Sequence, residues 1–398
     1  MTHIPLKHIA RANCFSLSET TDPDFQFFYC DISSVERGSL SIPESPISFY
    51  DAPSRARRLS SGSDVVMSTV RPYLKAVAQV PEESSSLVFS TGFAVLRPNQ
   101  NKVIPRYLYW VVQSDPFIYE ASRWSNGVSY PAINVEDLMR IKLPLPSLCI
   151  QKKLADYLDN ETAKIDHLIA KQRELIDLTN ARLQVWREHA FWGQATGDPF
   201  VSPPSGWEIR RNRHILEHVD GRSETGKEEM LSVSHITGVT PRSMKNVTMF
   251  EAESTVGYKL VGKNELVINT MWAWMGALGV SQYEGIVSPA YDVYRFRDLD
   301  TVNPMYFDCL YRTAAYVRLM KAHSRGIWHS RLRLYPEFFL RLSSLVPSKE
   351  IQDQLVSEND ERTAEAEMLT TRSNEAIDLL QERRSALITA AVTGQIEI

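Results

Sequence analysis

Apolar residues along positions 151–192 recur at spacings of three, four, seven and eight, which places them on one side of a helix. The stretch contains neither proline nor glycine, so the pattern predicts a single helix. At about 1.5 Å per residue this helix would be on the order of 60 Å long, more than a compact domain normally buries. Its apolar side therefore predicts a second helix packed along it, parallel or antiparallel.

The chain supplies this second helix through an internal repeat. A shift of 201 residues places Gln151 on Gln352 and the first helix on residues 351–393. The same shift superposes residues 64–69 on residues 265–270, so the repeat includes more than the helices. The sequence thus predicts two copies of one unit, each a globular segment of roughly 150 residues followed by a long helix. We expect the two helices to pack through Leu154, Leu158, Ile165, Leu168, Leu175, Leu355, Leu369, Ile377 and Leu380.

The globular segments combine strand and helix patterns. Residues 25–32 and 87–96 are rich in aromatic and β-branched residues, residues 65–67 read as a buried strand, and residues 105–120 read as a helix. The predicted fold class is mixed α/β (α+β), with two similar domains and two long helices. The predicted boundaries are 1–146 and 199–346 for the domains, and 147–198 and 347–398 for the helical segments.

Composition indicates the class of protein. The chain has 398 residues, of which 43% are hydrophobic, enough for two cores. No apolar run approaches the ~20 residues that cross a bilayer, and residues 1–10 lack the apolar core of a signal peptide, which predicts a soluble, cytoplasmic protein. The cysteines are isolated from one another, so we expect them to be reduced and structural, with no metal site.

Charge is unevenly distributed along the chain. The net charge is −4, yet residues 199–346 carry 18 basic and 15 acidic groups, and residues 1–146 carry 14 of each. Residues 347–398 carry 5 basic and 11 acidic groups. This distribution favours nucleic acid as the partner of the domains and protein as the partner of the helices.

The first domain contains three clusters of side chains suited to duplex DNA. Arginine and lysine pair with phosphates or guanine, and asparagine pairs with adenine. For any one of these residues a solvated charge or a packed aromatic ring is the simpler interpretation, so only the clusters carry the hypothesis. The candidates are Arg55, Arg57, Arg58, Arg71, Tyr73, Lys75, Arg123, Asn126, Ser129 and Tyr130.

The second domain repeats the frame with different side chains. Trp272 and Trp274 occupy the region of Arg71 and Tyr73 in the first copy. Residues 311–341 carry seven basic groups against the single acid Glu337, a density that attracts a phosphate backbone, although a solvated face is the alternative. The remaining candidates in this copy are Arg325, Trp328, His329, Arg331 and Arg333.

Motifs of known catalytic chemistry are not found in the sequence. Residues 221–227 and 257–263 have the Gly-x-x-x-x-Gly-Lys frame of a phosphate loop, but Glu228 and Asn264 stand where the hydroxyl residue belongs. The tetrapeptide of amino-methyltransferases, the Gly-x-Ser-x-Gly motif and the His-Glu-x-x-His motif are all missing. We therefore expect no catalytic residues, no cofactor and no metal.

These features together resemble the specificity subunit of type I restriction-modification systems. The most specific parts are residues 143–147, Leu-Pro-Leu-Pro-Ser, the following run Ile150–Asp159, and the ending Ala391–Gln395. The resemblance covers essentially the whole chain. It implies a non-catalytic subunit whose two target-recognition domains each read one half of an asymmetric bipartite DNA site. It also implies antiparallel helices that set the spacer, two adenine-methylating modification subunits bound around them, and restriction subunits in the full complex.

Two other classes of function remain open from the residues alone. One is a scaffold whose domains bind protein or RNA, and the other is a nuclease with scattered carboxylates. Duplex binding that weakens steeply with salt would separate DNA recognition from the scaffold. If DNA is the partner, we expect Arg71→Ala and Lys75→Ala to weaken binding through the first half-site only.

Overall fold

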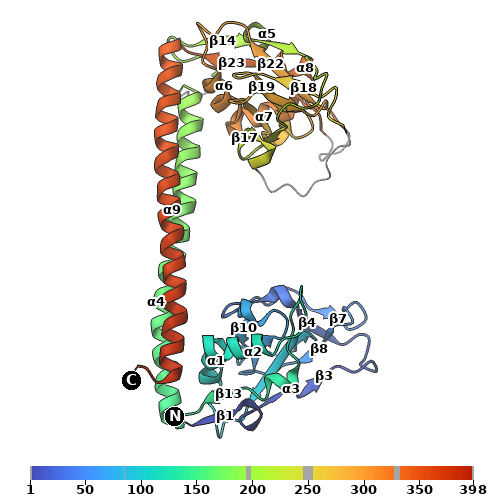
Figure 1. The fold of residues 1–398 in the computed structure, drawn as a ribbon, viewed down its shortest axis with the longest axis vertical. Helices are drawn as coiled ribbons and strands as arrows, with labels where there is room; N and C mark the ends of the chain where they lie inside the picture. The colour runs from blue at the N-terminus through green and yellow to red at the C-terminus, as the bar shows by residue number, and fades with distance from the viewer. Residues whose placement is uncertain (1, 85, 194–198, 245–253, 327–331, 397–398) are drawn as a thin grey trace. The chain divides into compact units, whose positions relative to one another are not determined.

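The computed structural model describes residues 2–84, 86–193, 199–244, 254–326 and 332–396. Contacts divide the chain into a first unit, Met1–Arg173 with Asn374–Ile398, and a second unit, Glu174–Ser373. Each unit contains one globular domain and a portion of both long helices (Figure 1). The predicted boundaries divide the chain into four consecutive segments, whereas the first unit combines the two ends of the chain. The four-segment division therefore stays a prediction.

In the first unit, the domain contains a four-stranded sheet, a five-stranded sheet and the two-stranded sheets β1-β13 and β5-β6. The four-stranded sheet has the order β10-β9-β12-β2 and is antiparallel throughout. The second sheet has the order β3-β8-β11-β4-β7, in which only β11 and β4 run parallel. The strands are β1 (His3–Pro5), β2 (Ala10–Ala12), β3 (Phe15–Ser16), β4 (Gln26–Cys30), β5 (Val35–Glu36), β6 (Ser39–Leu40), β7 (Ile47–Ser48), β8 (Ala56–Leu59), β9 (Val65–Ser68), β10 (Val77–Gln79), β11 (Leu87–Ser90), β12 (Phe93–Pro98) and β13 (Lys142–Pro144).

In the second unit, the four-stranded sheet has the same topology. Its order is β15-β22-β19-β20, again antiparallel throughout, and β19 lies 201 residues after β9. The strands are β14 (Glu208–Arg211), β15 (Leu216–Val219), β16 (Leu231–Ser234), β17 (Gly238–Pro241), β18 (Lys259–Val261), β19 (Leu266–Asn269), β20 (Leu278–Val280), β21 (Gly285–Val287), β22 (Tyr291–Phe296) and β23 (Ser343–Val346). The prediction of two domains with a common fold is confirmed.

Each domain contains short helices in addition to its sheets, and one long helix follows each domain in the chain. All residues of β9 and of β19 are buried, and the first three residues of each strand are apolar. The helices of the first domain are α1 (Pro105–Gln113), α2 (Asp115–Arg123) and α3 (Val135–Leu138), and those of the second are α5 (Asn212–Ile215), α6 (Pro304–Tyr311), α7 (Ala314–His323) and α8 (Pro336–Phe339). The long helices are α4 (Leu148–Phe191) and α9 (Lys349–Thr393).

The start of each long helix is fixed by a buried glutamine. Gln151 accepts a hydrogen bond from the Ile104 backbone N–H at 2.9 Å and donates to the carbonyls of Lys102 and Pro146. Gln352 makes the same three bonds in the second unit, accepting from Asn303 N–H at 2.8 Å. Both side chains are fully buried. This shared clamp is a physical reason for the repeated glutamine.

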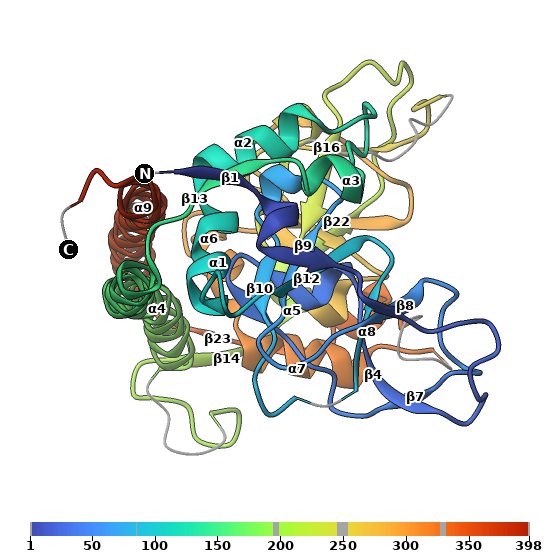
Figure 2. The ribbon, with the colours of Figure 1, turned by 90° about the horizontal axis from the view of Figure 1, so that it is seen from below.

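Within each unit α4 and α9 pack side by side and antiparallel, as Figures 1 and 2 show. In the first unit Leu158 and Ile388 belong to one core, and further along α4 Asp166 pairs with Arg384 at 2.9 Å. In the second unit Arg187 contacts Asn359 and Thr363, and Trp186 lies against Arg362. The predicted pairing of the two helices is confirmed.

The predicted packing residues need a correction in the middle of these helices. Leu154, Leu158, Ile165 and Ile377 are buried, and Leu355 and Leu380 are partly buried. Leu168, Leu175 and Leu369, however, are 48%, 43% and 44% exposed. The buried positions there are Ile169, Ala366 and Ser373. The contact in the middle of the pair therefore includes these positions, and the three leucines are partly exposed to solvent.

Two other sequence expectations can be compared with the described residues. Cys30 and Cys309 lie inside the fold, and none of the four cysteines is in a disulfide. Among the residues that the structure describes, no helix is long and apolar enough to span a membrane.

Candidate nucleic-acid interface

A short loop beside the end of β9 brings the candidate residues of the first domain together. Asn126 and Ala132 exchange two backbone hydrogen bonds of 2.9 Å and enclose residues 127–131. Gly127 has a φ of +109°, a backbone conformation that glycine adopts readily. The loop is tied to the strand end because Ile133 N–H donates to Thr69 O at 2.9 Å.

Arg71 lies under this loop and is held in place by it. Its guanidinium donates to Ser129 O at 2.9 Å and stacks on the ring of Tyr130 at 4.3 Å. Its backbone N–H donates to Pro131 O at 2.7 Å. The predicted residues Arg71, Ser129 and Tyr130 therefore form one group, which positions a guanidinium at the surface before any ligand arrives.

A cleft of about 770 Å³ opens next to this group. Arg37, Arg55, Arg71 and Tyr130 line it, together with Glu36. Within the described part of the chain none of the three guanidiniums forms an ion pair with a carboxylate, so positive charge remains available to a phosphate or a base edge. Sequence reasoning missed Arg37, because it is a lone arginine far from the other candidates in the chain.

The other candidates in the first domain are dispersed. Arg57 lies over the ring of Phe49 at 5.1 Å, and neighbouring residues of a strand such as Arg57 and Arg58 point to opposite faces. Arg123 is exposed at the end of α2 with Glu120 3.6 Å away. Tyr73 and Asn126 are also exposed.

Lys75 has a structural position instead. Its amine pairs with Asp115 and donates to Ser385 Oγ of α9 at 2.6 Å, and its side chain is only 12% exposed. Ser385 and Thr389 both donate to the carboxylate of Asp115. We call Lys75, Asp115, Ser385 and Thr389 the junction cluster, and we leave Lys75 out of the proposed interface.

The charge state of Asp115 follows from these contacts. Burial raises the pKa of its carboxyl, but hydrogen bonds from Lys75, Ser385 and Thr389 and the charge of Lys75 outweigh burial. The net result is a pKa below the usual value, so Asp115 is ionised at neutral pH. The junction cluster therefore holds a charged carboxylate between the domain and α9.

The second domain has a corresponding backbone bridge, formed by different residues. Arg325 and Arg333 exchange backbone hydrogen bonds of 2.9 and 2.8 Å, and Leu334 N–H donates to Thr270 O at 3.0 Å. The guanidinium of Arg325 stacks on Phe338 at 4.3 Å, and Arg333 is exposed. The predicted residues Trp328, His329 and Arg331 lie outside the described residues.

Two tryptophans, Trp272 and Trp274, occupy the places of Arg71 and Tyr73 in this domain. The rings of Trp272 and Trp274 stack at 6.3 Å with an angle of 15° between their planes, and Trp272 is 49% exposed. The amine of Lys321, which the sequence did not single out as a site residue, lies 5.8 Å from the centre of the Trp274 ring. The two domains thus present a cationic surface and an aromatic surface on one backbone frame.

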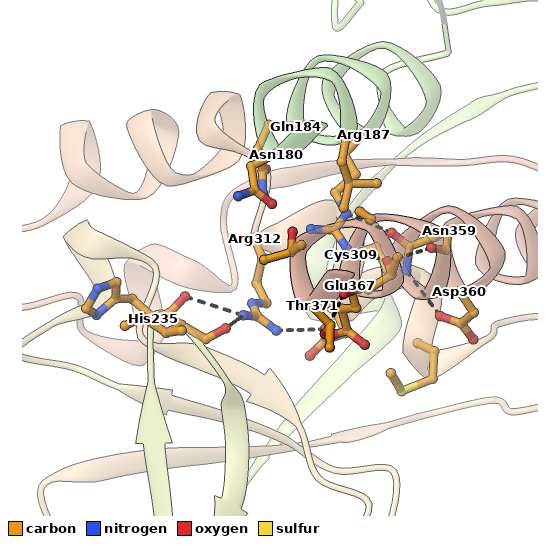
Figure 3. A pocket seen from close by; sticks show the side chains of 17 residues that line it. Asn180, Gln184, Arg187, His235, Cys309, Arg312, Asn359, Asp360, Glu367 and Thr371 are labelled. Atoms are coloured by element: carbon orange, nitrogen blue, oxygen red, sulfur yellow. Dashed lines mark hydrogen bonds and ion pairs between the residues drawn. The ribbon is translucent and has the colours of Figure 1, made fainter. Parts of the chain in front are cut away.

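A second cleft, of about 690 Å³, lies between the second domain and the helix pair within the second unit (Figure 3). Arg312 bridges from α6 to the carbonyls of His235 and Ile236, the latter at 2.6 Å. Burial raises the pKa of Asp308, against the opposing effect of Arg312, and burial lowers the pKa of Arg187. This cleft joins domain to helix and shares no residue with the loop site.

Among the residues that the structure describes, no group of three or more histidine, cysteine, aspartate or glutamate side chains is placed to hold a metal ion. The candidate interface is instead built from arginine, lysine and aromatic side chains, which bind phosphates and bases without a metal.

Part of the sequence is similar to known proteins. Residues 65–177 match the family model of the type I restriction modification DNA specificity domain. The type I restriction enzyme HindI specificity subunit of Haemophilus influenzae is 23% identical over 163 residues, which cover 40% of this chain and 32% of that protein. The putative MjaX specificity subunit of Methanocaldococcus jannaschii is 34% identical over 98 residues, 24% of this chain and 21% of that protein. The matched part spans a third or less of these relatives.

Solved structures extend the likeness of fold to the whole chain. A chain from work on complex assembly and conformational transition of the type I R-M system has a TM-score of 0.75 at 20% identity, covering 99% of this chain and 98% of its own. The HsdS subunit from Thermoanaerobacter tengcongensis has a TM-score of 0.54 at 21% identity, with coverage of 99% and 97%. Residues 65–177 thus resemble a type I restriction modification DNA specificity domain, and the whole chain shares its fold with these solved structures.

Proposed function

We propose that this chain is the non-catalytic subunit that gives a type I restriction-modification complex its DNA sequence specificity. One observation carries the proposal: two domains of the same topology present different side chains at the same position of the fold. Arg71 in the first domain corresponds to Trp272 in the second. Two different surfaces on one frame are suited to reading two different half-sites of an asymmetric bipartite target.

The proposed interface in the first domain comprises Arg37, Arg55, Arg71 and Tyr130 around the cleft, with Arg123 and Asn126 beside it. In the second domain it comprises Trp272, Trp274, Lys321, Arg325 and Arg333. Arginine and lysine supply phosphate contacts and base-edge hydrogen bonds, whereas the tryptophans supply flat apolar contact to bases such as thymine. These assignments predict different chemistry in the two half-sites.

For the helices we propose a protein partner. In the second unit Leu175, Leu178 and Val185 of α4 and Met368 of α9 are between 43% and 69% exposed. Several exposed apolar side chains along one helical region are typical of a protein-binding surface. We propose that two DNA-methyltransferase (modification) subunits bind along the helix pair, and that restriction subunits join the full complex.

The test is methylation mapping with the assembled complex and a library of duplexes. We expect wild type to direct methylation to one asymmetric bipartite sequence. Arg71→Ala should relax base preference in one half-site only, and Trp272→Ala in the other half-site only. Arg383→Ala, on an exposed part of α9, is the matched control and should change neither.

Equal relaxation of both half-sites by Arg71→Ala would refute the assignment of one domain to each half. Methylation at random positions by a well-folded wild-type complex would refute a specificity function altogether. Binding to RNA or protein in place of duplex DNA would favour the scaffold alternative.

A further inference from the structure

The two long helices are copies of one sequence, so each has a competing partner in the same helix of a second copy of this chain. The shift of 201 residues relates Leu158 to Asn359, Thr162 to Thr363 and Arg187 to Ile388. A pair formed by α4 and a second α4 would have the same antiparallel geometry as the observed pair. What favours the observed pair must therefore be found where the copies differ.

The second unit contains a polar layer between the helices. The Nε atom of Arg187 donates to Asn359 Oδ1 at 2.8 Å, and its NH2 group donates to Thr363 Oγ1 at 2.8 Å. Asn359 is only 6% exposed, and Figure 3 shows Arg187 reaching it from α4 across the cleft. Neither partner is charged, so the guanidinium is held by neutral acceptors in a partly buried place.

The first unit contains an apolar layer at the equivalent place. Leu158 and Ile388 are 0% and 2% exposed and belong to one core. Both layers contain a threonine at the equivalent position. Thr162 donates to the Leu158 carbonyl at 2.6 Å. Thr363 donates to the Asn359 carbonyl at the same distance. The layers therefore differ at two positions, and each is matched internally.

Exchange of partners would mismatch both layers. In a pair of two α4 helices Arg187 would face Leu158 and lose its bond to an asparagine, and in a pair of two α9 helices Asn359 would face Ile388. A buried polar group without its partner costs more than the bond itself contributes. A single polar layer of this kind is known to set partner and register in helix pairs.

An ion pair between α4 and α9 also favours the observed pair over a pair of two α4 helices. Asp166 of α4 pairs with Arg384 of α9 at 2.9 Å in the first unit. The counterpart of Arg384 on α4 is Leu183, so two α4 helices would place Asp166 opposite a leucine.

We propose that the polar layer of Arg187, Asn359 and Thr363 selects α9 of the same chain as the partner of α4, and disfavours α4 of a second copy. The consequence is that two different domains stay on one helix pair, because two copies of the first domain cannot be joined through matched helices. The inference concerns assembly and does not depend on which ligand the domains bind.

The intact chain can test this without separating its parts. Asn359→Leu sets Arg187 opposite leucine and so reproduces the α4–α4 layer in place. Leu158→Asn reproduces the α9–α9 layer. We expect each to lower the Tm of the affected unit by on the order of 5 °C, because Asn359→Leu removes one acceptor of Arg187 and Leu158→Asn buries an amide in an apolar layer. The double variant R187I/N359L gives the second unit the matched apolar layer and should return Tm to within about 2 °C of wild type.

The control is Leu369→Asn, at an exposed position of α9, which should leave Tm unchanged. Light scattering after refolding at rising concentration gives the readout of partner choice. There R187I/N359L should form several-fold more dimer than wild type. The inference is overturned if Asn359→Leu is as stable as wild type, if the double variant is no more stable than Asn359→Leu, or if wild type and double variant form equal fractions of dimer.

Discussion

Arg71 and Lys75 flank a turn of 3-10 helix, Pro72–Leu74, and both have left-handed backbone, with φ of 50° and 57°. This conformation costs a residue other than glycine on the order of 1 kcal/mol. Each side chain offsets that cost with specific partners, Arg71 with the 127–131 loop and Lys75 with the junction cluster. The equivalent of Lys75 in the second domain is Gly276, with a φ of 83°.

This comparison predicts an unusual order of stability at position 75. Lys75→Gly loses the ion pair but relieves the backbone, whereas Lys75→Ala loses the ion pair and keeps the strained conformation. We expect the alanine variant to be less stable than the glycine variant by about 0.5–1 kcal/mol in denaturant unfolding. Neither should alter the base preference of the first half-site. An alanine variant as stable as the glycine variant would contradict the backbone argument.

The candidate residues of the first domain differ in how well the sequence predicted their surroundings. Arg71, Ser129 and Tyr130 were predicted, and the fold brings them together across 58 residues of chain. Lys75 was selected for its charge, but its charge is directed at Asp115. Sequence gives the type of a side chain, whereas only the fold gives its nearest partner.

At the scale of elements, the attachment of each long helix to its domain depends on a glutamine in the first turn of the helix. Gln151 makes two hydrogen bonds to the loop before α1, and Gln352 makes two to the loop before α6. Each glutamine makes a third bond to the carbonyl of the proline that precedes its own helix. Because both amides are fully buried, their partners cannot be replaced by water. Each glutamine therefore helps to fix the direction in which its helix leaves the domain.

We expect Gln151→Ala and Gln352→Ala each to cost about 2–3 kcal/mol, since each leaves a buried backbone donor and two carbonyls unsatisfied. Each should destabilise only its own unit, which domain-resolved hydrogen exchange would show. Gln354→Ala is the matched control, because Gln354 is exposed and bonds only within its helix. A loss of protection spread evenly over both units would argue against the clamp.

The junctions between domain and helix differ in where the carboxylate lies. In the first unit Asp115 of the domain faces Thr389 of α9. In the second unit Glu188 of α4, the counterpart of Thr389, accepts hydrogen bonds from the N–H groups of Ala314 and Ala315 at the start of α7. A carboxylate near a helix N-terminus is favourable whether it belongs to the domain or to the long helix. Two carboxylates that face each other at the same N-terminus would repel each other.

We therefore expect Thr389→Glu to destabilise the first unit by about 1–2 kcal/mol through repulsion from Asp115. Adding Asp115→Ala should restore most of the loss, because the new glutamate would then cap α2 as Glu188 caps α7. Thermal unfolding of the wild type, both single variants and the double variant gives the coupling energy. Additive effects of the two substitutions would contradict this account.

For the whole molecule, the proposed function rests on charge in the domains and not on net charge. Exposed arginines that contact phosphates release counterions, so affinity for duplex DNA should fall linearly with salt on logarithmic axes. Arg55→Ala should reduce the magnitude of that slope by about 1, whereas Arg383→Ala on α9 should leave it unchanged. Filter binding or anisotropy over a salt series measures both. An unchanged slope for Arg55→Ala would remove that residue from the interface.

The sequence by itself determined the duplication, the two long helices and the mixed α/β class, because a 201-residue repeat and helical periodicity are properties of the residue order. Residues 143–159 also carried the resemblance to type I specificity subunits. These features need no knowledge of which residues touch.

Only the tertiary structure decided the contacts. It buried Ile169 and Ala366 in place of Leu168 and Leu369, moved Lys75 from the interface to the junction cluster, and added Arg37 to the cleft. It also revealed the polar layer of Arg187, Asn359 and Thr363. The physical reason is that periodicity marks the apolar side of a helix, whereas close packing and hydrogen-bond geometry between segments distant in sequence choose which residues on that side meet.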